Sequence, residues 1–227
     1  MFNIYTDMLA HPHVLIAGAT GSGKSVCINA MIYEFLKQEK YSQMVLIDPK
    51  RVELYPYHAL PCVRAYASEI PEIAQVLNGI CAEMDNRYRY TQQKGLREFP
   101  GGAIFVFVEE FADLMTLGKK ECLLPLCRIA QLGRAARIHL VLAAQRPTRD
   151  IIPGQIKVNI DCRLALRCPT AQDSRNIIGC NGAESLPMWG YGYYARPEDR
   201  SPIRVEIRKV SDAGLKRIAD ECRRRGY

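Results

Sequence analysis

The sequence has no long apolar run, no internal repeat and no low-complexity linker. No apolar stretch approaches the roughly 18 residues that a membrane-spanning helix needs. The first residues also lack a basic region followed by an apolar core and a cleavage site, so we expect no secretory signal peptide. Hydrophobic residues make up 48% and charged residues 24%, which is typical of a soluble globular chain. We therefore expect one domain over residues 1–227.

Paired cysteine spacings are also missing. There are nine cysteines, and none belongs to a C-x-x-C pair. A disulfide framework or a zinc site would need such pairs. Most of the cysteines lie in apolar or helical contexts, as Cys27, Cys81, Cys127 and Cys162 do. We expect reduced thiols that act as small hydrophobic side chains, and hence a cytoplasmic location.

The net charge is +7, and the basic excess is uneven. From Arg204 to the end there are eight Lys or Arg against four Asp or Glu, so this segment alone supplies +4. A basic excess suits an anionic partner such as nucleic acid, but it also aids solubility. The net charge alone therefore does not identify a partner.

Short apolar runs alternate with longer amphipathic stretches along the chain. This pattern predicts an α/β fold in which helices cover both faces of a mostly parallel sheet. The expected strands are 13–17, 44–47, 103–108, 138–144 and 162–166. The expected helices are 24–37, 70–92, 121–136 and a basic helix within 211–225. The segment 187–202 is typical of a loop or hairpin, and 203–207 of an edge strand.

A glycine-rich motif between the first strand and the first helix is the strongest chemical signal. Gly18-Ala19-Thr20-Gly21-Ser22-Gly23-Lys24-Ser25 fits G-x-x-x-x-G-K-[ST], the P-loop. Its glycines let backbone N–H groups point at phosphates, and the helix N-terminus adds partial positive charge. Lys24 is expected to reach the β- and γ-phosphates and Ser25 to bind Mg²⁺. The predicted ATP-binding residues are Gly18, Ala19, Thr20, Gly21, Ser22, Gly23, Lys24, Ser25 and Val26. The alternative is a glycine-rich turn that matches by chance.

Two carboxylates follow the third apolar strand. Nucleotide hydrolysis needs an acidic site that orients the metal and the attacking water. Glu109 and Glu110 stand where open α/β sheets bind ligands, at the carboxyl end of a strand. Strand alternation predicts that their side chains point differently. Glu109 would then bind the Mg²⁺ shell and Glu110 would polarise the water. A solvated acidic loop is the alternative.

Gln145 follows the fourth strand. An amide there is expected to lie beside the end of the P-loop strand, where it could sense the γ-phosphate. Without further context this position is only the exit from a strand.

Taken together, these motifs resemble the motor domain of the FtsK/SpoIIIE family of DNA translocases. The resemblance covers about 7–207 and depends on the order and spacing of several independent motifs. They are HVLIAGATGSGKSVCINAMI, LIDPKRVELYPY, FVFVEEFADLM, RIAQLGRAARIHLVLAAQRP, IIPGQIKVNIDCRLALR, DSRNIIG and SPIRVEI.

The resemblance implies a RecA-like core that forms a hexamer around double-stranded DNA, with ATP between subunits. By motif, Arg134 falls where the family has a basic residue suited to act as an arginine finger on the neighbouring subunit's nucleotide, with Arg137 as the second choice. Basic residues at a helix end are the alternative. Arg146 and Arg175 are the candidates for gripping the DNA backbone, and Arg149 and Lys157 are weaker ones. Solvated surface residues are the alternative for all four.

The chain departs from the family pattern in three respects. Glu109 stands where the family usually has Asp, which predicts slow hydrolysis because Mg²⁺ geometry is exacting. The segment between LIDPKRVEL and FVFVEE is short. No upstream membrane-spanning domain or C-terminal winged helix is expected in this chain. Three other functions stay open: a motor that moves protein, a conjugation coupling protein that moves single strands, and a hydrolysis-poor nucleotide-binding assembly module.

Overall fold

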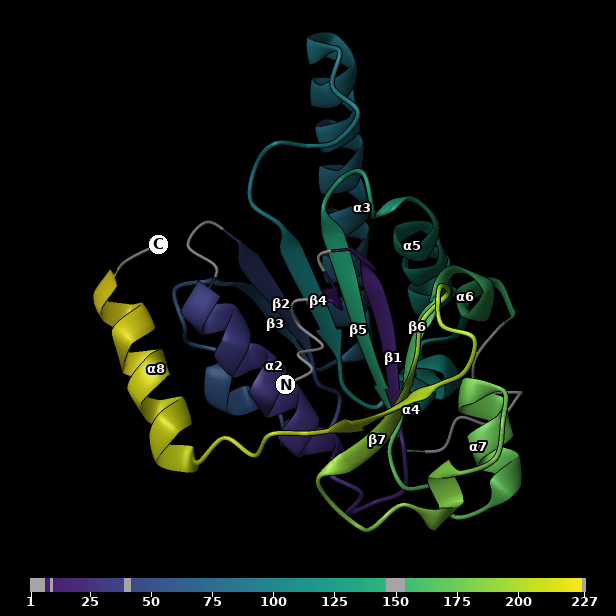
Figure 1. Ribbon diagram of the computed structural model, residues 1–227. Helices are drawn as coiled ribbons and strands as arrows, with labels where there is room; N and C mark the ends of the chain where they lie inside the picture. The colour runs from purple at the N-terminus through teal and green to yellow at the C-terminus, as the bar shows by residue number, and fades with distance from the viewer. Residues whose placement is uncertain (1–6, 9, 39–41, 146–153, 226–227) are drawn as a thin grey trace.

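A computed structural model describes residues 7–8, 10–38, 42–145 and 154–225. Within these residues, eight strands form one sheet in the order β3-β2-β4-β5-β1-β6-β7-β8 (Figure 1). The strands are β1 (His13–Ala17), β2 (Gln43–Ile47), β3 (Val63–Ala67), β4 (Ile104–Val108), β5 (Ile138–Ala144), β6 (Cys162–Ala165), β7 (Tyr191–Ala195) and β8 (Ile203–Glu206). The first six strands in chain order pair in parallel, and β7 and β8 add an antiparallel hairpin at one edge. The predicted mostly parallel sheet is confirmed.

Helices cover both faces of the sheet, as predicted. The helices are α2 (Lys24–Gln38), α3 (Ile70–Lys94), α4 (Phe111–Leu117), α5 (Lys119–Leu132), α6 (Gly154–Asn159), α7 (Ala171–Ile178) and α8 (Asp212–Arg225), with short 3-10 turns at η1 (Tyr55–Tyr57) and η2 (Ala183–Ser185). The core under one face contains side chains of α2 and α8, and the core under the other contains side chains of α3, α4, α5 and α6.

Strand β4 shows why the sequence forms a doubly covered sheet. Phe105 and Phe107 pack into the core beneath α2, whereas Ile104, Val106 and Val108 pack into the core beneath α3 and α5. Successive side chains of a strand point to opposite faces, so a strand buried on both sides must be apolar throughout. The uninterrupted apolar run IFVFV therefore indicates that this strand lies in the centre of the sheet.

The third predicted helix is shifted relative to the prediction. It was expected over 121–136, but α5 spans Lys119–Leu132. The chain turns at Gly133, where an added Cβ would lie 2.6 Å from the carbonyl oxygens of Ile129 and Ile138. A side chain cannot fit at such a distance, and Arg137 then reverses the chain with a φ of 54°.

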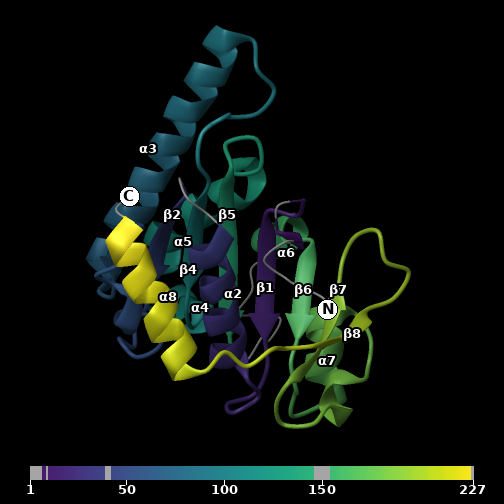
Figure 2. The ribbon, with the colours of Figure 1, turned by 60° about the vertical axis from the view of Figure 1, so that its left-hand side comes forward.

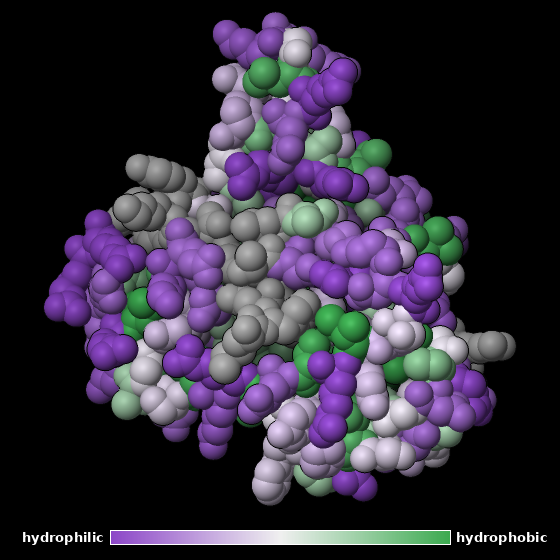
Figure 3. All heavy atoms as spheres, in the orientation of Figure 1, coloured by the Kyte–Doolittle hydropathy of each residue, from purple (hydrophilic) through white to green (hydrophobic). Residues whose placement is uncertain are grey.

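The carboxyl-terminal half of α3 projects beyond the body of the sheet, and α8 lies beside α2 (Figure 2). Hydrophilic side chains cover most of α8 and of the projecting part of α3 on the face shown in Figure 3. No helix among the described residues combines the length and the apolar character needed to cross a membrane.

Candidate functional site

Three motifs that are far apart in the sequence meet at the carboxyl-terminal edge of the sheet, where its parallel strands end. Strands β1, β4 and β5 are parallel neighbours, and Ala17 pairs with Ala144 while Val108 pairs with Leu142. Their carboxyl ends therefore lie together. The P-loop follows β1, the two glutamates follow β4, and Gln145 follows β5.

The P-loop glycines are required by its geometry. An added Cβ at Gly18 would lie 2.7 Å from Leu166 Cβ and from Ser22 Oγ, so no larger residue fits. Gly23 has a φ of 101°, a conformation that side chains rarely adopt. The loop leads directly into α2, whose first N–H groups have no partner within the helix and point out of its N-terminus. This is the cradle that a phosphate needs.

Lys24 lies between the two carboxylates. Its Nζ is 3.1 Å from Glu109 Oε1 and 3.4 Å from Glu110 Oε2, and all three residues are buried. The two carboxylates thus converge on one ammonium, although only Glu109 lines the cavity described below. Strand β4 ends at Val108, and Glu110 adopts a φ of 50°, so strand alternation does not extend to it. The Glu110 N–H also donates to Glu109 Oε2 at 2.9 Å.

A second cation, Lys50, also contacts the acidic groups of the site. Lys50 Nζ lies 3.3 Å from Glu110 Oε2 and 3.3 Å from Asp113 Oδ2. Burial raises the pKa of Glu109 above its ordinary value, although Lys24 opposes this shift. Partial burial alone would lower the pKa of Lys50, but Glu110 and Asp113 raise it overall. Buried charges persist only when they are paired, so each carboxylate depends on these lysines.

Gln145 lies where the sequence predicted it. Its side-chain Oε1 accepts a hydrogen bond from Thr20 Oγ1 at 3.1 Å, which links the end of β5 to the P-loop. Its backbone N–H donates to Glu110 Oε1 at 3.2 Å. Gln145 therefore contacts both the phosphate cradle and the second carboxylate.

A cavity of about 290 Å³ opens over this edge of the sheet. Its lining contains Ala19, Thr20, Gly21, Gly23, Lys24, Ser25, Val26, Glu53, Glu109, Gln145 and Trp189. The residues suit a magnesium nucleotide. The Ser25 hydroxyl and the Glu109 carboxylate are the oxygen ligands that Mg²⁺ prefers. The buried Ser22 Oγ has no hydrogen-bond partner in the described chain, and Ser22 does not line the cavity.

Lys50, Glu53 and Trp189 belong to the site but were not predicted. Lys50 and Glu53 follow β2, which pairs with β4 in parallel, so their position at the same edge requires the strand order. The sequence offered a signal for Lys50, because polar residues directly after a buried strand tend to face a ligand site. Trp189 lies in the segment that was read only as a loop or hairpin.

Arg134 and Arg137 lie at the opposite, amino-terminal edge of the sheet, where its parallel strands begin. They belong to the turn before β5, and this strand runs parallel to β1. Arg134 is exposed, and Arg137 is half-buried. The turn is tied to α3 by Arg87, whose guanidinium donates to the carbonyl oxygen of Ala136 at 2.8 Å. Neither arginine contacts the P-loop of its own chain.

Of the predicted DNA-binding residues, Arg146 and Arg149 lie outside the described part of the chain. Arg175 is exposed on α7 and donates to Gln172 Oε1 at 2.9 Å and to Asn181 Oδ1 at 2.5 Å. Lys157 on α6 is half-buried and donates to the carbonyl oxygen of Asn176 at 3.0 Å. Arg175 is thus the more accessible of the two.

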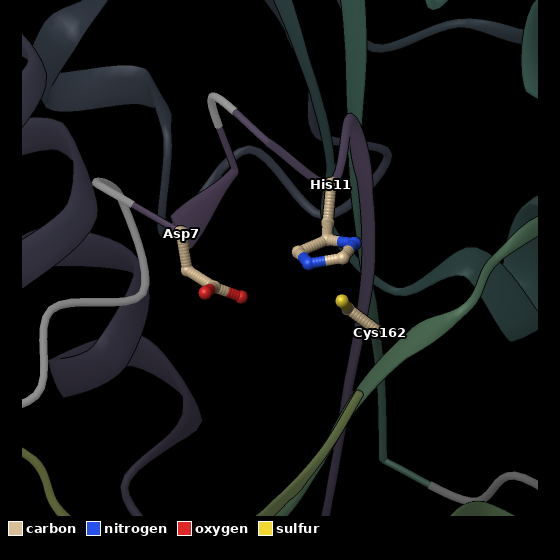
Figure 4. A group of neighbouring side chains, drawn as sticks. All are labelled: Asp7, His11 and Cys162. Carbon is tan, nitrogen blue, oxygen red and sulfur yellow. The ribbon is translucent and has the colours of Figure 1, made fainter. Parts of the chain in front are cut away.

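Asp7, His11 and Cys162 converge at the other end of β1 and β6 (Figure 4), with ligand atoms within 4.8 Å of one another. Asp7 and His11 already have protein partners. Asp7 accepts from Tyr194 at 2.7 Å and from Arg196 at 3.2 Å, and His11 lies 3.1 Å from Glu198. An arginine on the carboxylate opposes cation binding, so we read this group as a hydrogen-bonded network.

The comparisons with known proteins agree with the geometry. The chain is 39% identical to the DNA translocase FtsK of Oceanobacillus iheyensis over 93% of its length, and 36% identical to that of Pseudomonas aeruginosa over 98%. It spans 30% and 32% of those relatives, so it matches about a third of their length.

Solved structures share the fold. The conjugation coupling protein TcpA of pCW3, solved with ATPγS, superposes with a TM-score of 0.82 at 24% identity, over 95% of this chain and 66% of that one. The type VII secretion ATPase EccC of Thermomonospora curvata gives 0.80 at 22% identity, over 93% of this chain and 28% of that one. The chain therefore has the fold of P-loop ATPases. The FtsK/SpoIIIE family model matches residues 2–103 and 101–149. On these grounds, the chain belongs to the FtsK/SpoIIIE family.

Proposed function

We propose that this chain is a single RecA-like motor domain that hydrolyses ATP and moves double-stranded DNA. The domain spans 1–227, with the P-loop core at about 7–207. The observation that carries the proposal is the convergence of Lys24, Glu109, Glu110 and Gln145 at one sheet edge, in a chain 39% identical to a DNA translocase. Nine free cysteines agree with work in the cytoplasm.

The residues that the sequence predicted divide the tasks of phosphoryl transfer among them. The P-loop N–H groups and Lys24 bind and orient the β- and γ-phosphates. Ser25 and Glu109 would hold Mg²⁺, which when bound neutralises charge on the phosphates. Glu110 accepts the proton of the attacking water, and the Gln145 N–H, 3.2 Å from its Oε1, fixes its orientation. Because Lys24 now pairs with both carboxylates, phosphates that attract it would release Glu110 for this role.

In the proposed ring, a neighbouring subunit supplies the arginine that this chain cannot bring to its own nucleotide. Arg134 lies at the sheet edge opposite the P-loop, so it would serve the nucleotide of a neighbouring subunit. An arginine finger stabilises the charge of the transferred phosphoryl group. We propose a hexamer, with Arg137 as the second choice for the finger. Arg175, Arg146 and Arg149 would grip DNA phosphates without reading sequence.

A hydrolysis-poor assembly module is the second candidate function. Burial raises the pKa of Glu109, and this glutamate replaces the shorter Asp usual in the family. Such a module would bind ATP without turnover. Changing Glu109 to Asp would then raise the hydrolysis rate.

The test is steady-state ATP hydrolysis without DNA, with linear duplex and with single strands, at low and moderate salt. The proposal predicts strong stimulation by duplex that fades with salt, because backbone contacts release counterions. Stimulation by single strands alone would instead indicate a coupling protein. Turnover that ignores DNA would favour a motor that moves protein, and binding without turnover would favour the assembly module.

A further inference from the structure

Trp189 is exposed beside the phosphate cradle. It is the only tryptophan in the chain, and 69% of its surface is exposed. Large aromatic side chains bury much apolar area when they are covered, so an uncovered one is a candidate binding surface. It is also the only residue from the carboxyl-terminal third of the described chain that lines the nucleotide cavity.

The segment that carries Trp189 packs on the P-loop itself. An added Cβ at Gly21 would lie 3.5 Å from Met188 Cε, and one at Gly23 would lie 4.0 Å from the backbone nitrogen of Gly190. Trp189 stands between these two contacts in the chain. The residues on either side of Trp189 therefore lie against the two glycines that shape the phosphate cradle.

The protein holds this segment on both sides. Leu186 is buried in a small core with Ala17 at the end of the P-loop strand. On the other side, Gly190 has a φ of 81° that favours glycine, and its carbonyl oxygen accepts a hydrogen bond of 2.8 Å from the N–H of Ile207. The backbone on both sides of Trp189 is therefore held by the same framework as the P-loop.

We infer that Trp189 is the stacking platform for the base of the bound nucleotide. This inference rests on the proposed ATP site and adds its base-binding side. The P-loop binds the phosphates. Among the other residues that line the cavity, Trp189 is the one that offers an aromatic face. Aromatic faces stack on nucleobases and accept any base, because every base has a π-face. The platform thus contributes affinity and positions the base, and it does not read the base edge.

The single tryptophan makes the inference directly measurable. Addition of Mg-ADP to the wild-type chain should change the Trp189 emission, and the change should saturate with the dissociation constant found by calorimetry. Inorganic triphosphate carries no base and should bind the P-loop with a smaller change. Equal emission changes with both ligands, or no change with ADP, would overturn the platform.

Two variants separate stacking from the phosphate site. Trp189→Ala should weaken ADP binding about 5- to 150-fold, the range that corresponds to loss of one base–aromatic stack. Trp189→Phe should stay within a few-fold of wild type, and neither variant should alter the affinity for inorganic triphosphate. Leu124→Ala, which truncates another exposed apolar side chain away from the cavity, is the matched control.

The outcomes distinguish this inference from the function on which it rests. If wild type binds both ligands and Trp189→Ala loses neither, the platform is wrong and the P-loop site stands. A wild-type chain that binds neither ligand would remove the proposed function and the platform together. The measurements are made at a concentration where sedimentation shows a monomer. A Trp189→Ala effect on assembly alone, with unchanged ADP affinity in the monomer, would assign the indole to a subunit contact instead.

Discussion

At the residue scale, the chemistry depends on one buried ammonium shared by two buried carboxylates. Lys24 contacts Glu109 and Glu110, but only Glu110 has a second cation in Lys50. The motif predicted Lys24 and its phosphate role from spacing alone. It did not predict that the lysine also neutralises the acidic pair, because this contact depends on β1 and β4 flanking β5 in the sheet.

Lys24→Ala should therefore abolish nucleotide binding and also destabilise the fold. Loss of the ammonium leaves Glu109 buried without its partner, and breaking a buried ion pair costs about 3–5 kcal/mol. Adding Glu109→Gln to Lys24→Ala should restore more than about 1 kcal/mol of the free energy of unfolding, since a neutral amide needs no counter-charge. Urea unfolding of the four chains in a double-mutant cycle measures this. Strictly additive free energies would show that the two side chains are not coupled.

At the element scale, periodicity predicted the central elements and missed those whose patterns are weak. The buried strands β1 and β5 were found residue for residue, because a doubly covered strand is a continuous apolar run. Strand β3 was missed because it lies at the sheet edge, and its Arg64 and Tyr66 break the apolar pattern.

Helix α7 was missed despite a readable signal. Thr170 caps it by accepting the N–H of Asp173 at 3.1 Å, and a Thr followed three residues later by an acidic residue is an N-terminal signature. Helices α4 and α6 have only seven and six residues, which is too short for a helical period to emerge.

Helix α8 had no predicted role, and the structure assigns one face of it to the core. Ile218 is buried with side chains of α2, while Lys216 on the same helix is exposed. Ile218→Ala should lower the free energy of unfolding by about 2–5 kcal/mol, the usual cost of such a cavity. Lys216→Ala is the control and should stay within about 0.5 kcal/mol of wild type. Chemical denaturation measures both, and equal effects would mean that α8 is a solvated appendage.

At the scale of the whole molecule, two buried histidines tie stability to pH. Burial, with His139 nearby, lowers the pKa of His13 to about 3, and burial lowers that of His139 to about 4. An unfolded histidine titrates near pH 6.5. Below this pH the unfolded chain binds more protons than the folded one, so stability is complete above about pH 6.5 and falls as the pH drops toward 4.

Within this window, each histidine should lower the free energy of unfolding by about 1.4 kcal/mol for each unit that the pH falls. Urea unfolding at several values between pH 7.5 and pH 5 measures the slope. His139 stacks on Phe105 with ring centroids 4.5 Å apart, so His139→Phe keeps an aromatic ring there. This variant should reduce the slope by about half, since one of the two titrating groups is gone. A flat profile in the wild-type chain would contradict neutral buried histidines.

The proposed ring, in which neighbouring subunits share active sites, predicts how mixed subunits behave. Arg134→Ala should bind ATP without turnover, and Lys24→Ala should not bind it, so each chain alone should be inactive. In an equal mixture, about a quarter of the interfaces pair an intact P-loop with an intact arginine, so activity should partly return. Steady-state ATP hydrolysis as a function of mixing ratio measures this, and a mixture without activity would place Arg134 outside the neighbour's site.

The central claim is that ATP hydrolysis at this site moves the chain along duplex DNA. Displacement of a short third strand from a duplex measures this movement directly, at a protein concentration that saturates duplex-stimulated hydrolysis. The account predicts ATP-dependent displacement by the wild-type chain and none by Glu110→Gln, which should still bind ATP. Duplex-stimulated hydrolysis that leaves the third strand in place would contradict it.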